Sequence, residues 1–491
     1  MKISRTILQP RWKVTLFMWL TFIVVITIWK HASVGLMMLL IVWSYMLILC
    51  LNDWKNNIVC LCFLILFFVF LIGREVCFSY LSVPVYYTYL APYNSFAYVC
   101  MIISLLGIGV GNFVQITNFN NGHIRMAKCD GNNRVEHNTQ KIAKYIFFVC
   151  YMFSVIAVCT QILFIRQVGY LGTYVEKNVE YQLPGVVSYI AAFMGLSFYV
   201  YLSTFPDRKS AWFPIAMYEL YGVLTVFTGK RYPFVAISMI IFIYMVIRSR
   251  KENGWMTRKM IVTVILLVPC QIVFLALYDS IRVGQGIKFS GIINTVINFF
   301  DGQGGSINVI KRIRYFEKEI ADLHMCSFET TRSVIFENFI MRKFTGINAM
   351  TGNSIERALN GNSLMHRLSY LTYGNAYLSG RGVGSCYIAE LFFDFGYLGI
   401  LVGSVLYGKI MSAVNNLGRH GYIIDGILLA MMYYILLAPR GHFDAFLGDV
   451  FTIYSILGIF AVKMIGMAVR RKQYKSVLNF KASRVSIGEK S

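Results

Sequence analysis

The sequence has few charged residues for its length. Only 14% of its 491 residues are Asp, Glu, Lys or Arg, whereas 57% are hydrophobic and 16% are aromatic. A soluble protein of this length carries about a quarter of its residues as charged side chains. The deficit excludes a protein whose whole surface faces water, and it indicates a surface largely in contact with lipid.

Acidic residues are especially scarce, since 23 Asp and Glu stand against 46 Lys and Arg, a net charge of +23. The sequence also contains many long apolar runs, each near the length needed to cross a bilayer. We place them at 15–29, 32–51, 58–73, 96–117, 145–165, 188–205, 211–228, 232–247, 260–278, 386–408, 421–438 and 446–469. The sequence therefore predicts an all-α, polytopic membrane bundle of about twelve transmembrane helices.

The positive charge is concentrated in the connections of one side. If the N-terminus is cytoplasmic, the cytoplasmic segments hold 26 of the 46 basic residues but only six of the 23 acidic ones. This distribution follows the positive-inside rule with both termini in the cytoplasm. Topology thus accounts for most of the +23, and we expect no nucleic-acid partner.

Signals for processing and for metal binding are also lacking. No small-residue cleavage pattern follows the first apolar run, so we expect no removable signal peptide. The 11 cysteines include no CxxC or Cys/His spacing typical of a metal site, and we expect neither a metal nor another cofactor. Cys77, Cys326 and Cys386 fall outside the cytoplasm or at its far membrane edge, and the sequence leaves open whether two of them form a disulfide.

One long segment lacks any run apolar enough to span. The predicted organisation is a nine-helix bundle at 1–278, a large extracytoplasmic loop at 279–385, three further helices at 386–470 and a basic cytoplasmic tail at 471–491. Within the loop, Ser306 can cap an amphipathic helix. Its predicted apolar face is Ile307, Ile310, Ile313, Phe316, Ile320 and Leu323, and its polar face is Lys311, Arg312, Arg314, Glu317, Lys318 and Asp322. This helix is expected to lie on the membrane surface or to cover the bundle.

Arginine is depleted on the extracytoplasmic side of membrane proteins, so the presence of each remaining arginine there calls for a physical explanation. Taken singly, each can reach lipid phosphates, and Arg74 can pair with Glu75. Taken together, guanidinium groups can converge on a pyrophosphate, whose oxygens they bind in pairs. The candidates for that site are Arg74, Arg231, Arg282, Arg381 and Arg440.

Carboxylates and a histidine near the last helices are candidates for acid–base chemistry. Glu390 and Asp394, spaced i and i+4, lie on one face of a helix near its outer end, after glycines at 380, 382 and 384 that suit an anion. They are either partners for the arginines or a general base and a sugar ligand. His442 and Asp444 form a second candidate acid–base pair, and a hydrogen-bonded interfacial histidine is the alternative.

Three segments resemble the Wzy-type polymerases of O-antigen and capsular polysaccharide: FFDGQGGSINVI at 299–310, YLSGRGVGS at 377–385 and IAELFFDFGYLGILVG at 388–403. The resemblance implies a metal-independent glycosyltransferase of the cytoplasmic (inner) membrane with its active site on the periplasmic or extracellular side. Such an enzyme transfers a growing glycan from polyprenyl (undecaprenyl) pyrophosphate to a new lipid-linked repeat unit, as in lipopolysaccharide synthesis. Flippase and chain-length regulator proteins of the same pathway are the expected partners.

The chemistry implied by this resemblance gives each candidate residue a role. The arginines would stabilise the departing pyrophosphate, and Glu390, or His442 with Asp444, would supply the base. Asp301, Gln303, Tyr387 and Asp394 are expected to contact substrate. Two alternatives remain. One is a ligase that moves finished glycan from the same lipid, and the other is a lipid-linked oligosaccharide flippase, for which we would expect similar halves and short loops.

Overall fold

The computed structural model describes residues 2–3, 33–81, 87–115, 133–175, 184–257, 291–337, 341, 343–344, 350 and 352–464. Within these ranges the fold is helical, apart from a two-residue antiparallel ladder between Lys2–Ile3 (β1) and Val114–Gln115 (β2). The predicted helical class is therefore confirmed for the described part of the chain. The predicted spans 15–29 and 260–278 lie outside it.

Eight described segments are long and apolar enough to cross a membrane. They comprise α2 (Val34–Asn52), the run of α3 (Ile58–Phe67), η2 (Phe68–Ile72) and α4 (Gly73–Leu81), η3 (Thr88–Tyr93) with α5 (Asn94–Phe113), α6 (Asn133–Val168), α7 (Gly185–Ala192) with α8 (Met194–Ser203), α10 (Tyr232–Ser249), α19 (Tyr387–Asn415), and α20 (Tyr422–Leu437) with η8 (Ala438–Arg440). The protein is thus a polytopic membrane protein, and the number of twelve spans stays a prediction.

Two other predicted spans have a different form. The run 211–228 corresponds to helix α9 (Arg208–Val226), which begins earlier because the Asp207 carboxylate accepts a hydrogen bond from the Ser210 amide at 3.4 Å. In place of one helix over 446–469, the structure has the short helix α21 (Ala445–Gly448) and then an apolar helix over Ile453–Met464. Both segments contribute to the end of the bundle that carries the site.

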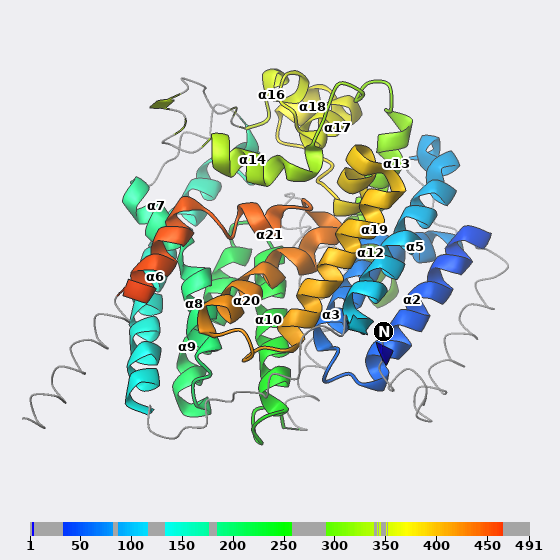
Figure 1. The fold of residues 1–491 in the computed structure, drawn as a ribbon. Helices are drawn as coiled ribbons and strands as arrows, with labels where there is room; N and C mark the ends of the chain where they lie inside the picture. Colours follow the sequence, from blue (N-terminus) through cyan, green and yellow to red (C-terminus); the bar gives the residue numbers. More distant parts are fainter. Residues whose placement is uncertain are drawn as a thin grey trace, which may run out of the picture.

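The large loop is folded over one end of the bundle (Figure 1). We call this end the loop end and the other the opposite end. The loop consists of α12 (Ile292–Gln303), η6 (Gly304–Ser306), α13 (Ile307–Tyr315), η7 (Cys326–Phe328), α14 (Glu329–Phe336), α16 (Ile355–Leu359), α17 (Leu364–Tyr373) and α18 (Asn375–Leu378). An amphipathic loop that covers the bundle was one of the two placements expected from its sequence.

Helix α13 differs from its prediction in two ways. Its apolar residues Ile307, Ile310 and Ile313 are buried as expected, but the side chain of Ser306 makes no capping hydrogen bond and the helix ends at Tyr315. The predicted polar face is also not wholly in solvent, since Lys311 and Arg312 are only 4% and 3% exposed. The reason is tertiary packing, because α13 contacts η2, η3, α5, α17 and α19 rather than lying free on a surface.

Close packing of α5 against α19 fixes the helix that carries Glu390. Glycines allow the two backbones to touch: a Cβ on Gly111 would lie 2.2 Å from the Val405 carbonyl oxygen. Small residues at such contacts are typical of membrane helix pairs. Near its N-terminal end, α19 is kinked at Gly396, whose φ of 62° and ψ of −153° are not helical. The first two turns of α19 therefore form a separately oriented segment at the loop end.

Candidate active site

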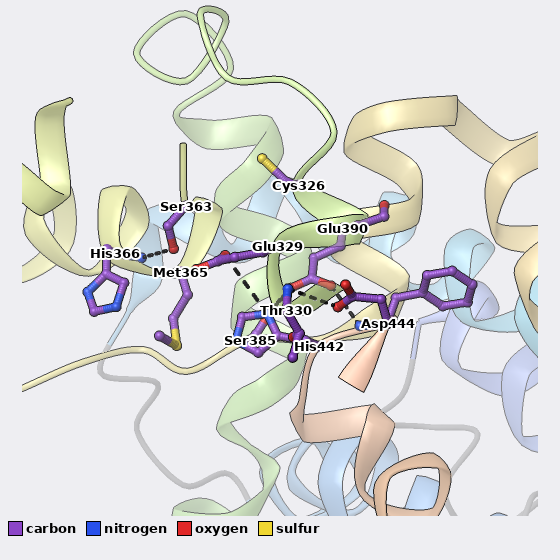
Figure 2. A network of polar contacts seen from close by, with 12 residues as sticks. Cys326, Glu329, Thr330, Ser363, Met365, His366, Ser385, Glu390, His442 and Asp444 are labelled. Carbon is purple, nitrogen blue, oxygen red and sulfur yellow. Dashed lines mark hydrogen bonds and ion pairs between the residues drawn. The ribbon is translucent and has the colours of Figure 1, made fainter. Parts of the chain in front are cut away.

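Glu390 lies at the centre of a polar network at the N-terminus of α19. Its carboxylate is fully buried and accepts hydrogen bonds from the Ser385 hydroxyl, from His442 Nδ1 at 2.7 Å and from the Phe443 amide at 2.8 Å (Figure 2). Residues from the start of α19 and from the turn after η8 thus meet at one carboxylate. The structure brings together Glu390 and His442, which the sequence offered as separate candidates.

His442 is held as a cation by its neighbours. Burial by itself lowers the pKa of His442, but the charge of Glu390 and its hydrogen bond outweigh that effect and raise the pKa to about 10. Glu329 and Asp444 act in the same direction, and Glu329 Oε2 lies 4.0 Å from His442 Nδ1. The side chain remains 23% exposed. It is therefore a charged imidazolium at neutral pH that an anionic substrate can reach.

Asp394 and Asp444 fasten the loop to the bundle. Asp394 accepts two backbone N–H groups at the start of η7, at 3.0 and 2.6 Å. Asp444 accepts two backbone N–H groups in the first turn of α14, at 3.3 and 2.6 Å. Carboxylates accept well from such free amides at a helix N-terminus. Both acids therefore position Glu329, the first residue of α14, over the pair formed by Glu390 and His442.

A second group of charged residues lies on α4, α12 and α13. Helix α4 directly follows the π-helical turn η2. Arg74 pairs with Asp301 at 2.9 Å, and Lys311 pairs with Glu75 at 2.8 Å. The close approach of η6 to α4 requires Gly304, because a Cβ there would lie 2.4 Å from Arg74 Cβ. The expected alternative of an Arg74–Glu75 pair is thus wrong, and each residue has a partner from the loop.

Arg312, next to Lys311, is buried without a carboxylate partner among the residues that the structure describes. It is 3% exposed, its Nε has no hydrogen-bond partner, and its guanidinium lies 5.0 Å from the centre of the Tyr87 ring. Burial raises the pKa of Tyr373 to about 12. The charges of Arg312 and Arg381 both lower it, so both arginines act on the same tyrosine. A buried cation that lacks an anion is costly and indicates a binding role.

Arg440 connects these charges to the pair of Glu390 and His442. It donates to Gln303 Oε1 and lies 5.9 Å from the centre of the Phe70 ring. Because it is two residues from His442, their Cα atoms are within about 7 Å. We call Arg74, Lys311, Arg312, Arg381 and Arg440 the basic cluster. Within the cluster, Arg74 pairs with Asp301 and Lys311 pairs with Glu75.

The chain matches the family described as O-antigen polysaccharide polymerase Wzy over residues 12–472. It belongs to this family. No curated protein and no solved structure matches the chain. The resemblance drawn from the three sequence segments is therefore confirmed.

Several predicted site residues of the Wzy-family polymerase lie elsewhere. Arg282 is outside the described residues. Arg231 is half-buried at the N-cap of α10. Its neighbour Lys230 lines a cavity of about 290 Å³ together with Tyr199, Tyr218, Tyr221, Tyr433 and Tyr434. Tyr387 is fully buried and hydrogen-bonds to the Ser104 hydroxyl on α5. The structure thus gives Tyr387 a role in helix packing, and contact of Arg231 with substrate stays a prediction.

The glycine run before α19 is explained by backbone geometry. Gly380 has a φ of 94°, and a Cβ there would lie 2.2 Å from the Leu171 carbonyl oxygen. Cys77, Cys326 and Cys386 are free thiols, which answers the disulfide question for these three residues. Within the described ranges no group of three or more His, Cys, Asp and Glu could hold a metal ion. The absence of a metal from the reaction stays a prediction of the sequence.

Sequence reasoning missed Lys311, Arg312 and Glu329 as site residues. The first two were assigned to a solvated helix face because they lie opposite its isoleucines. Glu329 gave no signal, since a glutamate in the first turn of a helix is ordinary. Only the packing of the loop against α4 and α19 makes these three side chains part of the site.

Proposed function

We propose that this Wzy-family polymerase transfers a glycan from a polyprenyl pyrophosphate to a hydroxyl group of a second lipid-linked repeat unit. The observation that carries the proposal is the basic cluster, which residues of the large loop and of the bundle form together and whose Arg440 lies two residues from His442, the partner of buried Glu390. A pyrophosphate is an activated leaving group, so catalysis needs mainly stabilisation of departing charge, orientation of the acceptor and a base.

Arg312 is the group best suited to hold the pyrophosphate. Its guanidinium is already desolvated, and its Nε has no partner among the described residues, so a phosphate oxygen can complete its hydrogen bonds. Arg381 and Arg440 are exposed and can contact a second phosphate. These cations can supply the charge stabilisation that a metal supplies in other transferases, and the proposed mechanism includes none.

The orientation follows from the distribution of charge. The connections that the sequence assigns to the cytoplasm hold 26 of the 46 basic residues, and three members of that set, Arg248, Arg250 and Lys251, lie at the opposite end, which favours the cytoplasmic side for that end. The loop end then faces the periplasm or the cell exterior, where the substrate carried by the lipid would reach the basic cluster from the outer leaflet. We accordingly propose the cytoplasmic membrane as its location.

The test compares two arginines of α13 that lie two residues apart. Arg312→Ala removes the buried guanidinium, whereas Arg314→Ala removes one that is 43% exposed and paired with Glu317 at 2.7 Å. Purified variants would be given a lipid-linked repeat unit, and the lengths of the lipid-linked products measured. We expect Arg312→Ala to lower the rate of elongation by about 100-fold or more, and Arg314→Ala by less than about 2-fold.

Product length separates this activity from that of a ligase, which would not lengthen a lipid-linked chain. Full elongation by Arg312→Ala would remove Arg312 from the pyrophosphate site. Arg231→Ala and Arg440→Ala in the same assay test two further arginines that the sequence offered as candidates. Absence of elongation by the unmodified protein would refute the proposed function itself.

A further inference from the structure

Glu329 is more exposed than the two carboxylates that lie with it around His442. Its side chain is 13% exposed, whereas Glu390 and Asp444 are fully buried. Glu329 Oε2 is itself a buried atom, has no hydrogen-bond partner among the described residues and lies 4.0 Å from His442 Nδ1. Figure 2 shows Glu329 beside Glu390 and above His442, on the side of Ser363 and His366.

The residues expected to act as the base are occupied. Glu390 accepts three hydrogen bonds and has no exposed surface. Asp444 accepts two backbone amides and is equally buried. His442 already carries its second proton, because the carboxylates around it stabilise the imidazolium. A base must come within hydrogen-bond reach of the hydroxyl that it deprotonates, and none of these three groups can offer an accessible lone pair.

We propose that Glu329 is the general base that deprotonates the acceptor hydroxyl, an inference that rests on the proposed polymerase function. As the hydroxyl oxygen attacks the anomeric carbon of the donor sugar, its proton passes to the carboxylate of Glu329. The new glycosidic C–O bond forms while the bond from the anomeric carbon to the phosphate oxygen breaks, and the polyprenyl pyrophosphate leaves with the bonding electrons. His442 stays protonated and orients Glu329, and the basic cluster receives the charge of the leaving group.

The surroundings of Glu329 suit this role. Burial raises the pKa of Glu329, and the charge of Glu390 on α19 also raises it. His442, a hydrogen bond from Ser363 and Arg357 on α16 act in the opposite direction, but the pKa remains above the ordinary value. Three further titratable groups lie in this neighbourhood. Burial raises the pKa of the Cys326 thiol, which stays neutral, and lowers the pKa of His366 to about 3. Burial also raises the pKa of Asp449, which interacts with His442, to about 6. A carboxylate whose pKa is raised toward neutrality is a better base than an ordinary one.

The experiment compares two glutamates of the same loop segment. Glu329→Gln keeps the shape of the side chain and removes the base. Glu337→Gln, at the C-cap of α14, alters an exposed residue that accepts a hydrogen bond from Ser333 at 2.9 Å. With purified full-length protein and a lipid-linked repeat unit, we expect Glu329→Gln to lower kcat by about 100-fold or more with little change in KM. Glu337→Gln should stay within about 2-fold of the unmodified protein.

Donor binding distinguishes this inference from the proposed function. Polyprenyl pyrophosphate alone should raise the melting temperature of Glu329→Gln as much as that of the unmodified protein, whereas Arg312→Ala should lose this shift. Elongation by Glu329→Gln at the full rate would overturn the assignment of the base and leave the polymerase function intact. If neither the variants nor the unmodified protein lengthens the lipid-linked chain, the proposed function is refuted instead.

The pH profile provides a second readout that does not depend on Glu329→Gln folding. The unmodified protein should lose kcat on the acid side, at a pH above the ordinary pKa of glutamate, about 4.3. Glu329→Asp should retain part of the rate and move this acid limb to lower pH, because aspartate is the stronger acid. An acid limb that stays in the same place in Glu329→Asp would show that another group titrates there, and the proposal would fail.

Discussion

Both ends of the bundle contain a buried arginine, and the two arginines differ in their partners. At the opposite end, Arg248 is 2% exposed, donates to both Glu252 oxygens at 2.7 and 2.8 Å and to the Pro206 carbonyl at 3.1 Å, and stacks on Trp255. Arg250 and Lys251 next to it donate to the backbone carbonyls of Asn415 and Leu417. At the loop end, Arg312 is equally buried and its Nε is unpaired like that of Arg248, but Arg312 has neither a carboxylate nor a carbonyl partner among the described residues.

This difference separates buried charge that has partners within the fold from buried charge that has no described anion. The cations at the opposite end join the C-terminal end of α10 to the end of α19 and the turn after it, so their positive charge is used within the fold. The fold leaves the buried charge of Arg312 unsatisfied, a state that persists when a site needs it for binding. The number of charges alone does not make this distinction, because it counts the cations of both ends alike.

The largest expected effect is a contrast between neighbours on α13. Lys311→Met leaves Glu75 buried with only the Tyr98 hydroxyl, at 2.7 Å, and we expect the free energy of unfolding to fall by about 3–5 kcal/mol. Arg312→Met removes a buried charge that has no described partner, so stability should stay the same or rise by about 1 kcal/mol. Thermal and denaturant unfolding in detergent would measure both.

The double variant Glu75→Gln with Lys311→Met is the control for the first change, because it removes both charges and should recover part of the loss. If Arg312→Met were as destabilising as Lys311→Met, Arg312 would be one more structural cation. The distinction drawn between the environments of Arg248 and Arg312 would then be wrong.

Sequence patterns predicted those features that depend on composition or local periodicity. Hydropathy located the bundle, and the three-to-four residue spacing predicted which isoleucines of α13 are buried. The motifs at 299–310, 377–385 and 388–403 indicated the family that the match over residues 12–472 confirms. Glu390 and His442 were found because carboxylates and histidines are rare at such positions, although nothing in the sequence joined them.

The remaining parts of the site depend on packing between segments far apart in the chain. Lys311 and Arg312 were assigned to solvent since helical periodicity cannot show that both sides of α13 are covered. Glu329 reaches the site only because Asp394 and Asp444 hold the start of the loop helices against α19 and α21. The break at Gly396 was likewise invisible, because a glycine within an apolar run gives no sign of its φ.

A smaller effect is expected from Arg248 at the opposite end. Arg248→Met removes charge-assisted hydrogen bonds to Glu252, but that carboxylate is 52% exposed and can be hydrated instead. We therefore expect a loss of about 2 kcal/mol in the free energy of unfolding, with elongation per mole of folded protein unchanged. Arg208→Met, at the exposed start of α9, is the control and should change stability by less than about 0.5 kcal/mol. A loss of elongation in folded Arg248→Met would contradict the division between the two ends.

The last prediction concerns the pH dependence of stability that arises from His442, whose charge is created by its neighbours. Its pKa is about 10 in the folded protein against 6.5 for an ordinary histidine. A raised pKa contributes stability that is fully present below about pH 6.5 and is lost as pH rises through 10, with a slope of at most about 1.4 kcal/mol per pH unit. Unfolding measured between pH 6.5 and 10 should show this decline, and His442→Gln should flatten it. His420, which pairs with Asp425 at the opposite end at 3.2 Å and is 37% exposed, is the matched control. His420→Gln should leave the alkaline decline in place; a decline that persists in full in His442→Gln would mean that Glu390 does not stabilise a cation at this site.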